Sequence, residues 1–191
     1  MAGMLLTLKP TVRIAVTVTF LRLRLPAAAS RPLPADTILV RLQACTVPFY
    51  RYLYWSVGHQ YVWWMRNSMS DASLDSVLRD SAVSIWVLYH AGEPAGFFEL
   101  DVRALPTVNL SYFGLLPHAT GRGWGSRLLD AAIEAAGTLG GQTLTVNTCT
   151  ADHHRALPGY LRAGFEPVRT VREVWDVPTG LGLPIPDHLR L

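Results

Sequence analysis

The first clear pattern of hydrophobic and polar residues lies near the N-terminus. Val12, Ile14, Val16, Val18 and Phe20 alternate with smaller or polar residues. A period of two is typical of a half-buried β-strand. At residues 20–21 the alternation changes phase, which predicts a bulge or the end of the strand at that point.

The same segment is apolar enough to require comparison with signal peptides and membrane helices. Lys9, Arg13, Arg22 and Arg24 interrupt it, and no small-residue cleavage site follows a clean apolar run. Spanning and secretory segments need a longer uninterrupted apolar stretch. We therefore expect a strand here, and no association with a membrane.

Two helices are predicted after a Pro-rich connector at residues 26–34. The first begins near Pro48, because proline suits a first helical turn, and it ends at Gly58. The second is short, and Ser70 or Asp71 caps its start. Its apolar residues recur at helical spacing, namely Leu74, Val77 and Leu78.

From residue 83 onward the period of two returns and predicts three consecutive strands. They cover about residues 84–89, 95–102 and 107–116, and a turn at residues 91–94 joins the first two into a hairpin. Next come a glycine-rich loop and an amphipathic helix with one apolar face, made by Leu128, Leu129, Ala132, Ile133 and Ala136.

The remaining elements are a strand, a short helix and a last strand, at residues 142–149, 152–162 and 168–177. Asp152 is the expected N-cap of that short helix. The strand before the glycine loop and the strand after the long helix form a predicted βαβ crossover. Such a crossover makes its two strands parallel neighbours.

This order of elements predicts an α/β fold in a single domain over residues 1–191. We expect a mixed, mostly antiparallel sheet of six to seven strands flanked by helices. Residues 1–35 would form the N-terminal strand and connector, and residues 178–191 an irregular tail.

Composition narrows the class of protein. Half of the 191 residues are hydrophobic and only 16% are charged, which is enough apolar material for a large core. The net charge of +3 is mild, and the arginines are scattered, so the chain lacks the basic stripe of a nucleic-acid-binding groove. Cys45 and Cys149 do not form a C-x-x-C pair, so we expect no metal site and a reducing, cytoplasmic setting.

The glycine-rich loop is the first candidate site. Gly121, Gly123 and Gly125 alternate directly between a strand and a helix. Glycine lets the backbone approach a ligand, and a helix start offers free N–H groups to an anion. A dinucleotide fold would need G-x-G-x-x-G, and a Walker loop would need a lysine. A plain tight turn remains the alternative.

The segment Phe113-Gly114-Leu115-Leu116-Pro117, followed by Thr120-Gly121-Arg122-Gly123-Trp124-Gly125-Ser126, resembles the core motif of the GCN5-related N-acetyltransferases (GNAT family). Thr120 departs from the Gln or Arg of the family pattern, which puts one side-chain contact in doubt but not the backbone cradle. A second segment, Ala156 to Phe165, is similar to the family's Ala-x-x-x-Tyr-x-x-x-Gly-Phe helix. The resemblance covers residues 95–165, extends back to about residue 45, and does not include the first 35 residues.

The resemblance implies acetyl-CoA, or another acyl-CoA, as cosubstrate, held without a metal. In this family the cosubstrate lies between two strands that splay apart. The strand positions whose backbone would face the pantetheine are Phe113, Gly114 and Leu115. The loop positions that would hold the pyrophosphate are Gly121, Arg122, Gly123, Trp124, Gly125 and Ser126.

The resemblance also suggests catalytic residues. Tyr160 matches the family's acid, which protonates the departing sulfur, and the alternative is a buried aromatic of the core. Asn109 stands where histone-type members carry a glutamate base. Glu99 and Asp101 on the neighbouring strand are the replacements we consider, and ordinary surface carboxylates are the alternative. Cys149 is expected to be a buried filler rather than an acyl carrier.

The expected function is transfer of an acetyl group to a primary amine of a small molecule or a protein. A catalytically weak acyl-CoA-binding or sensing module is the alternative. A toxin that acylates aminoacyl-tRNA is disfavoured by the mild charge. We expect no nucleic-acid partner, and a homodimer is left open. Aromatic residues that could line the acceptor side are Tyr54, Trp55, Trp63 and Trp64, together with Arg66.

Overall fold

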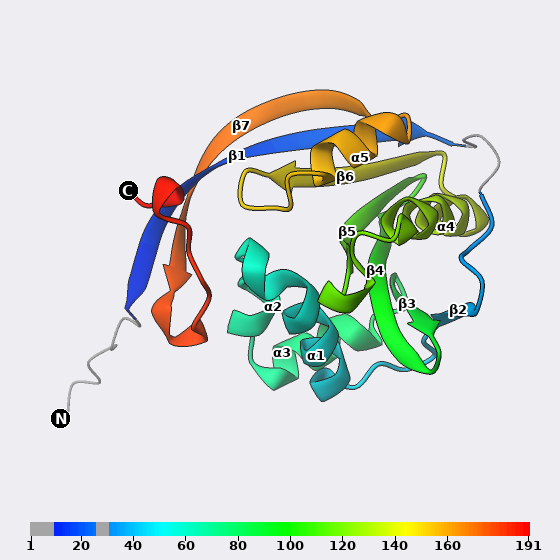
Figure 1. Ribbon diagram of the computed structural model, residues 1–191, viewed down its shortest axis with the longest axis horizontal. Coiled ribbons are helices and arrows are strands. Elements are labelled where there is room, and N and C mark those ends of the chain that lie inside the picture. The colour runs from blue at the N-terminus through cyan, green and yellow to red at the C-terminus, as the bar shows by residue number, and fades with distance from the viewer. Residues whose placement is uncertain (1–9, 26–30) are drawn as a thin grey trace.

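The computed structural model describes residues 10–25 and 31–191, and in this part of the chain seven strands form one sheet (Figure 1). The strand order is β2-β3-β4-β5-β6-β1-β7. All neighbours are antiparallel except β5 and β6, which are parallel. The predicted mixed, mostly antiparallel sheet is therefore confirmed. The strands are β1 (Thr11–Arg24), β2 (Thr37–Arg41), β3 (Val83–His90), β4 (Glu93–Ala104), β5 (Thr107–Leu115), β6 (Thr143–Cys149) and β7 (Glu166–Pro178).

Helices cover both faces of the sheet. One apolar cluster joins α4 and α5 to one face, and a second joins α1 and α3 to the other. Neighbouring residues of β4 show this division, since Phe98 belongs to the first cluster and Phe97 to the second. The helices are α1 (Val47–Gly58), α2 (Met65–Ser68), α3 (Asp71–Arg79), α4 (Trp124–Thr138) and α5 (Ala156–Arg162).

The starts and ends of the helices follow the signals expected from the sequence. Pro48 occupies the first turn of α1, which ends at Gly58. Ser70 caps α3, since its hydroxyl accepts a hydrogen bond from the Ser73 N–H at 3.2 Å. The helix α4 connects β5 to the parallel strand β6, so the predicted crossover is confirmed.

β1 lies between β6 and β7, although β1 comes first in the chain (Figure 1). Ile14, Val16 and Val18 on one face pack in a third apolar cluster with residues of the C-terminal tail. Leu21 and Leu23 on the other face belong to the α4–α5 cluster. The change of phase in the sequence arises because the two faces of β1 are covered at different ends. The predicted irregularity is confirmed, since the register of β1 against β7 shifts between residues 20 and 21.

Two segments differ from expectation or extend it. The five-residue strand β2 pairs with β3 at the edge of the sheet, and the sequence did not predict it because it is too short to show alternation. The tail contains two short 3₁₀ turns, Thr179–Leu181 and Asp187–Leu189. The connector predicted at residues 26–34 lies partly outside the described residues.

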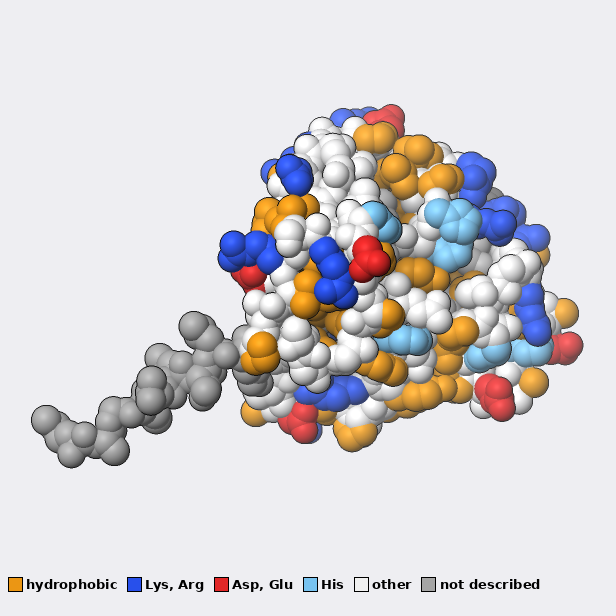
Figure 2. All heavy atoms as spheres, turned by 60° about the vertical axis from the view of Figure 1, so that its left-hand side comes forward, with side chains coloured by type: hydrophobic (Ala, Val, Ile, Leu, Met, Phe, Trp, Pro, Cys, Tyr) orange, Lys and Arg blue, Asp and Glu red, His pale blue; other side chains and the backbone are white. Residues whose placement is uncertain are grey.

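The surface carries no concentrated basic band on the face drawn in Figure 2. Arg side chains are scattered there among apolar, acidic and histidine side chains (Figure 2). Among the helices of the described segments, none is both long and apolar enough to cross a membrane.

Candidate active site

The site begins at a fork between the two parallel strands. The ladder between β5 and β6 joins only residues 107–109 to residues 143–145. At the fork, Thr145 Oγ1 donates to Asn109 Oδ1 at 3.1 Å, and Asn109 Nδ2 donates to Ser111 Oγ at 3.0 Å. Beyond this point β5 and β6 separate, so the last residues of β5 have no sheet partner on that side. Asn109 therefore holds the fork together rather than facing a ligand.

A cleft of about 1430 Å³ runs through the fork. Its walls come from β5, the glycine loop, α4 and α5, with further residues from the end of α1 and the loop before α5. The predicted site residues that line it are Phe113, Gly114, Leu115, Gly121, Gly123, Gly125, Ser126 and Tyr160. The fold thus brings together two sequence motifs more than 30 residues apart.

The glycine loop is shaped to leave its backbone accessible. Gly121 and Gly123 have φ of +78° and +77°, in the left-handed region that favours glycine. A Cβ at either position would meet no atom within 4 Å. Gly123 is the N-cap of the 15-residue helix α4, and no side chain caps this end. The first N–H groups of α4 are therefore available to an anion, and the helix dipole favours one.

Two predicted loop residues do not line the cleft. The Arg122 guanidinium lies over the Trp124 ring, 5.2 Å from its centroid. The Trp124 ring contacts His90 and packs against the α4–α5 cluster. The contribution of Arg122 and Trp124 to cosubstrate binding stays a prediction. Their contacts indicate that both residues pack against the side of the loop that faces away from the cleft.

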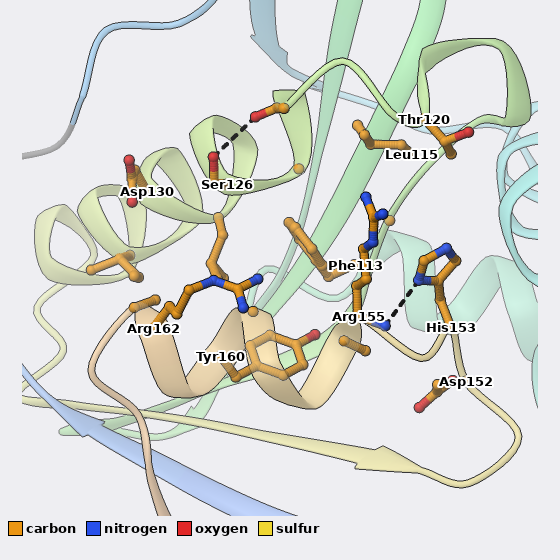
Figure 3. A pocket seen from close by; sticks show the side chains of 18 of the residues that line it. Phe113, Leu115, Thr120, Ser126, Asp130, Asp152, His153, Arg155, Tyr160 and Arg162 are labelled. Carbon is orange, nitrogen blue, oxygen red and sulfur yellow. Dashed lines mark hydrogen bonds between the residues drawn. The ribbon is translucent and has the colours of Figure 1, made fainter.

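Tyr160 on α5 faces Phe113 on β5 across the cleft, with ring centroids 6.2 Å apart (Figure 3). The Phe165 ring packs against Tyr160 from another side, at 5.5 Å. Burial, with a smaller contribution from the Asp152 carboxylate, raises the pKa of Tyr160 above its ordinary value. The raised pKa keeps the hydroxyl protonated. Because the hydroxyl has no hydrogen-bond partner among the described residues, it is also free to donate to a ligand.

Glu99 lies outside the cleft, under α1. Its carboxylate accepts a hydrogen bond from Tyr50 Oη at 2.5 Å and forms an ion pair with Arg66 at 2.6 Å. Glu99 is fully buried. Burial acts to lower the pKa of Arg66, but the Glu99 charge and nearby tyrosines outweigh it and raise that pKa. Asp101, the other carboxylate considered, pairs with Arg103 and does not line the cleft either.

The segment before α5 differs from expectation. Asp152 was predicted to cap this helix, but α5 begins at Ala156 and no side chain caps it. Asp152 Oδ2 instead accepts hydrogen bonds from the Cys149 N–H and Thr148 Oγ1, both at 2.8 Å. Asp152 therefore closes the turn that follows β6, and this turn delays the start of the helix.

Sequence reasoning missed several residues of the cleft wall. Arg31, Arg155 and Arg162 line it, as does His153. Arg31 pairs with Asp130 of α4 at 2.7 Å. Figure 3 shows Arg155 and Arg162 at the two ends of α5, both beside the cleft. No periodic pattern marks these arginines, so only the spatial arrangement could identify them.

Of the aromatic residues considered for the acceptor side, Trp63 lines the cleft. The Tyr54 and Tyr112 rings pack against it, with centroids 5.2 Å away in both cases. Trp55 stacks on His59, and Trp64 belongs to the cluster under β1. Trp63 is therefore the member of this group that a ligand can reach.

Solved structures with the same fold are numerous. A Drosophila protein superposes with a TM-score of 0.66 and 18% identity, covering 89% of this chain and 54% of its own. A GCN5-related N-acetyltransferase from Kribbella flavida gives 0.60 and 14%, covering 87% and 60%. An aminoglycoside acetyltransferase from an uncultured soil metagenomic sample gives 0.54 and 15%, covering 68% and 88%.

At these identities the structures establish the fold alone. The chain spans just over half the length of the Drosophila protein and three fifths of the Kribbella protein. No curated protein sequence gives a significant match. The model of the acetyltransferase (GNAT) family, however, matches residues 45–165, which include β3 to β6, the glycine loop, α4 and α5. The chain therefore belongs to the GNAT acetyltransferase family.

Proposed function

We propose that this protein is an N-acetyltransferase that transfers the acetyl group of acetyl-CoA to a primary amine of a small molecule or a protein. The observation that carries this function is one continuous cleft. It joins the uncapped N-terminus of α4 to the free hydroxyl of Tyr160 through the fork between β5 and β6. The same cleft thus contains a helix start that could bind an anion and a phenol that could donate a proton, which supports the proposal.

The residues present fit an acyl-CoA. The backbone amides of residues 121–126 would bind the pyrophosphate at the helix start. The unpaired edge of β5 at Phe113, Gly114 and Leu115 would hydrogen-bond the pantetheine amides. Arg155 and Arg162 line the same cleft and add positive charge for phosphate groups.

When bound, acetyl-CoA supplies an acyl group activated as a thioester. Tyr160 would donate its phenolic proton to the departing sulfur, because its raised pKa keeps it protonated at neutral pH. Phe113 and Phe165 hold the ring in place. The acceptor must attack as the neutral amine, so its ammonium form first loses a proton.

The general base is less defined than the acid. The role predicted for Glu99 stays a prediction, since both of its oxygens are engaged by Tyr50 and Arg66 and it does not line the cleft. Loss of the proton to water, from an amine of moderate pKa, requires no side chain. We favour this route for the deprotonation.

A second candidate is an acyl-CoA-binding or sensing module with little turnover. Asn109 favours it, because an amide stands where histone-type members carry a glutamate and it is fixed to Thr145. The retained Tyr160 favours the enzyme. Cys45 and Cys149 are both free thiols, which agrees with a reducing cytoplasmic location. A homodimer stays an open expectation.

Calorimetric titration with acetyl-CoA, with ATP and NAD as controls, tests the proposed function. Selective binding in the micromolar range, about −8 kcal/mol, followed by thiol release with a panel of amines, is expected. Binding without release of thiol would favour the sensing module. The absence of selective acetyl-CoA binding would exclude both.

Gly123 offers a sharper test of the loop. Gly123→Val should weaken acetyl-CoA binding at least tenfold, because valine at φ of +77° is strained and distorts the anion site. Gly180→Ala is the matched control, since that glycine has an ordinary φ and its added Cβ meets no atom within 4 Å. Unchanged affinity of the Gly123 variant would mean that the loop does not bind the pyrophosphate.

A further inference from the structure

The end of the cleft beside α1 is lined by residues outside the two sequence motifs. Val57 lines it from the end of α1, and Tyr61 and Trp63 line it from the segment that joins α1 to α2. Asp152 and His153 line it from the loop before α5. If an acyl-CoA extends from the glycine loop to the fork, this end is left for the acceptor.

Asp152 carries a negative charge without a cationic partner among the described residues. Its three hydrogen bonds come from neutral donors, namely Trp63 Nε1 at 3.3 Å to Oδ1, and Thr148 Oγ1 and the Cys149 N–H at 2.8 Å to Oδ2. A carboxylate accepts about four hydrogen bonds, so one acceptor position remains. A partly buried carboxylate without a cationic partner is stabilised when a cation binds beside it.

Neighbouring cationic groups do not neutralise this carboxylate. Figure 3 shows the Arg155 guanidinium and the Asp152 carboxylate pointing to opposite sides of the loop. His153 Nδ1 accepts the Arg155 N–H at 3.1 Å, and burial, His154 and Arg155 lower the pKa of His153, so its ring is neutral. The acidic residues of α4 that line the cleft are Asp130, which pairs with Arg31, and Glu134.

The charge of Asp152 reaches the groups that face the cleft. After burial, it is the second cause of the raised pKa of Tyr160 and of Tyr61. Asp152, Tyr61 and Tyr160 line the same cleft, so a cation at Asp152 would share that cleft with the proton donor of the reaction.

The walls around Asp152 are aromatic or aliphatic. The indole of Trp63 is tied to Asp152, and the Tyr61 ring lies edge-on to His153 with centroids 5.8 Å apart. Aromatic faces attract an ammonium group and also bury an apolar body. Val57 adds an aliphatic surface next to Gly114.

We propose that Asp152, Tyr61, Trp63 and Val57 form an ammonium subsite that selects primary monoamines with an aromatic or other apolar body as acyl acceptors. The inference rests on the proposed acetyltransferase function and deepens it. Asp152 binds the protonated amine, and the three apolar walls contact its body. The subsite determines the affinity for the ammonium form, and the minor fraction of amine that has lost its proton to water is the form that attacks the thioester. One carboxylate suits one ammonium group, so polyamines such as aminoglycosides bind less well.

The test compares a cation with its neutral isostere. Phenethylamine and 2-phenylethanol are titrated into the protein by calorimetry at pH 7, with and without CoA, which gives no turnover. The wild type is expected to prefer the amine by roughly tenfold or more, the scale of one charge-assisted hydrogen bond. Added salt reduces that preference. Equal affinity for the two ligands overturns the subsite.

Two variants test whether Asp152 causes the preference for the amine over the alcohol. Asp152→Asn keeps an oxygen for the Thr148 and Cys149 donors and removes the charge, so the preference for the amine should vanish while alcohol binding persists. Asp75→Asn makes the same change in charge on the exposed part of α3 and should leave the preference intact. A preference that survives in Asp152→Asn overturns the assignment. If that variant does not fold, the wild-type comparison alone decides.

Two further titrations separate the possible failures. Sisomicin, an aminoglycoside, should bind more weakly than phenethylamine, and tighter binding overturns the selection of monoamines. CoA itself is titrated into the same sample. Binding of CoA without any preference for the ammonium ligand refutes only the subsite, whereas failure to bind CoA refutes the proposed function.

Discussion

At the scale of single residues, burial decides which groups of the cleft can exchange protons. Tyr160 is only 6% exposed, yet its hydroxyl has no hydrogen-bond partner among the described residues. Burial favours the neutral phenol, and the nearby Asp152 acts in the same direction. A group with a raised pKa keeps its proton as the pH rises, so Tyr160 remains an acid over the neutral range.

Tyr160→Phe is therefore expected to lower kcat by about 10²- to 10⁴-fold, the usual contribution of a general acid. The phenyl ring keeps its contacts with Phe113 and Phe165, so the affinity for CoA should change little. Steady-state thiol release and calorimetry measure the two quantities. A rate unchanged at every pH would show that another group protonates the sulfur.

The two cysteines provide a test that depends on pH. Burial raises the pKa of Cys149 to about 12 and that of Cys45 to about 11. At pH 8 the thiolate fractions are then about 10⁻⁴ and 10⁻³, too low for rapid alkylation. Iodoacetamide should label neither thiol quickly in the folded protein and both in urea. Rapid labelling of Cys149 at pH 8 in the folded protein would contradict its buried environment.

At the scale of elements, the cleft depends on how closely α1 approaches β5. A Cβ on Gly114 would lie 2.4 Å from the Val57 side chain. Glycine is therefore required at this position for space, not for its backbone angle. The close contact fixes the wall made by the end of α1 against the strand that would bind the pantetheine.

Gly114→Ala should lower the free energy of unfolding by about 1–3 kcal/mol, the usual cost of overpacking. Adding Val57→Ala should recover part of that loss, because it removes the clashing methyl groups. Urea unfolding of both single variants and the double variant measures this coupling. Strictly additive losses would show that the two residues do not compete for space.

The Arg66–Glu99 pair joins β4 to α2. Glu99→Gln should lower the free energy of unfolding by about 3–5 kcal/mol, because it leaves the Arg66 charge without its partner. Asp75→Asn, which breaks the exposed pair with Arg79, should cost less than about 1 kcal/mol. The pH–rate profile of Glu99→Gln also tests the predicted base, since an unaltered shape would remove Glu99 from that role.

The elements themselves were largely predictable because their signals are local. Strand alternation, Pro48 at the start of α1 and the Ser70 cap all depend on neighbouring residues. Asp152 shows the limit of such reasoning. A residue suited to cap a helix closes the preceding turn instead, because the partners it finds there are Thr148 and the Cys149 N–H.

The site was predictable only in part for the same reason. The glycine loop and Tyr160 belong to sequence motifs, so their meeting at one cleft could be expected. Arg31, Arg155 and Asp152 reach the cleft through loops without a periodic pattern. Glu99 is followed on the same strand parity by Asp101 and Arg103, which are not buried, and the sequence does not reveal that α1 covers Glu99.

At the scale of the whole molecule, the N-terminal strand β1 completes the half of the sheet that is otherwise made by the C-terminal strands β6 and β7. β1 pairs with β6 on one side and with β7 on the other, so it is the middle strand of that half of the sheet. The alternation at residues 12–20 predicted a strand but carried no information about its partners. Strand order depends on long-range pairing, which local patterns do not record.

β1 should therefore contribute more to stability than β7. Ile14→Ala is expected to lower the free energy of unfolding by about 2–5 kcal/mol, because Ile14 is fully buried at 0% exposure. Val174→Ala on β7, at 54% exposure, should change it by less than about 0.5 kcal/mol. Urea unfolding measures both. Equal effects would mean that β1 is not an integral strand of the sheet.

The position of β1 also affects the order in which the sheet can form during synthesis. On the ribosome this segment emerges before all other strands, yet its first partner, β6, begins at residue 143. A nascent chain therefore carries an apolar strand without a partner until residues 143–149 have been synthesised. Contacts between such distant residues form slowly, because a long loop must close first. Insertion of β1 between β6 and β7 would then be a late event in folding.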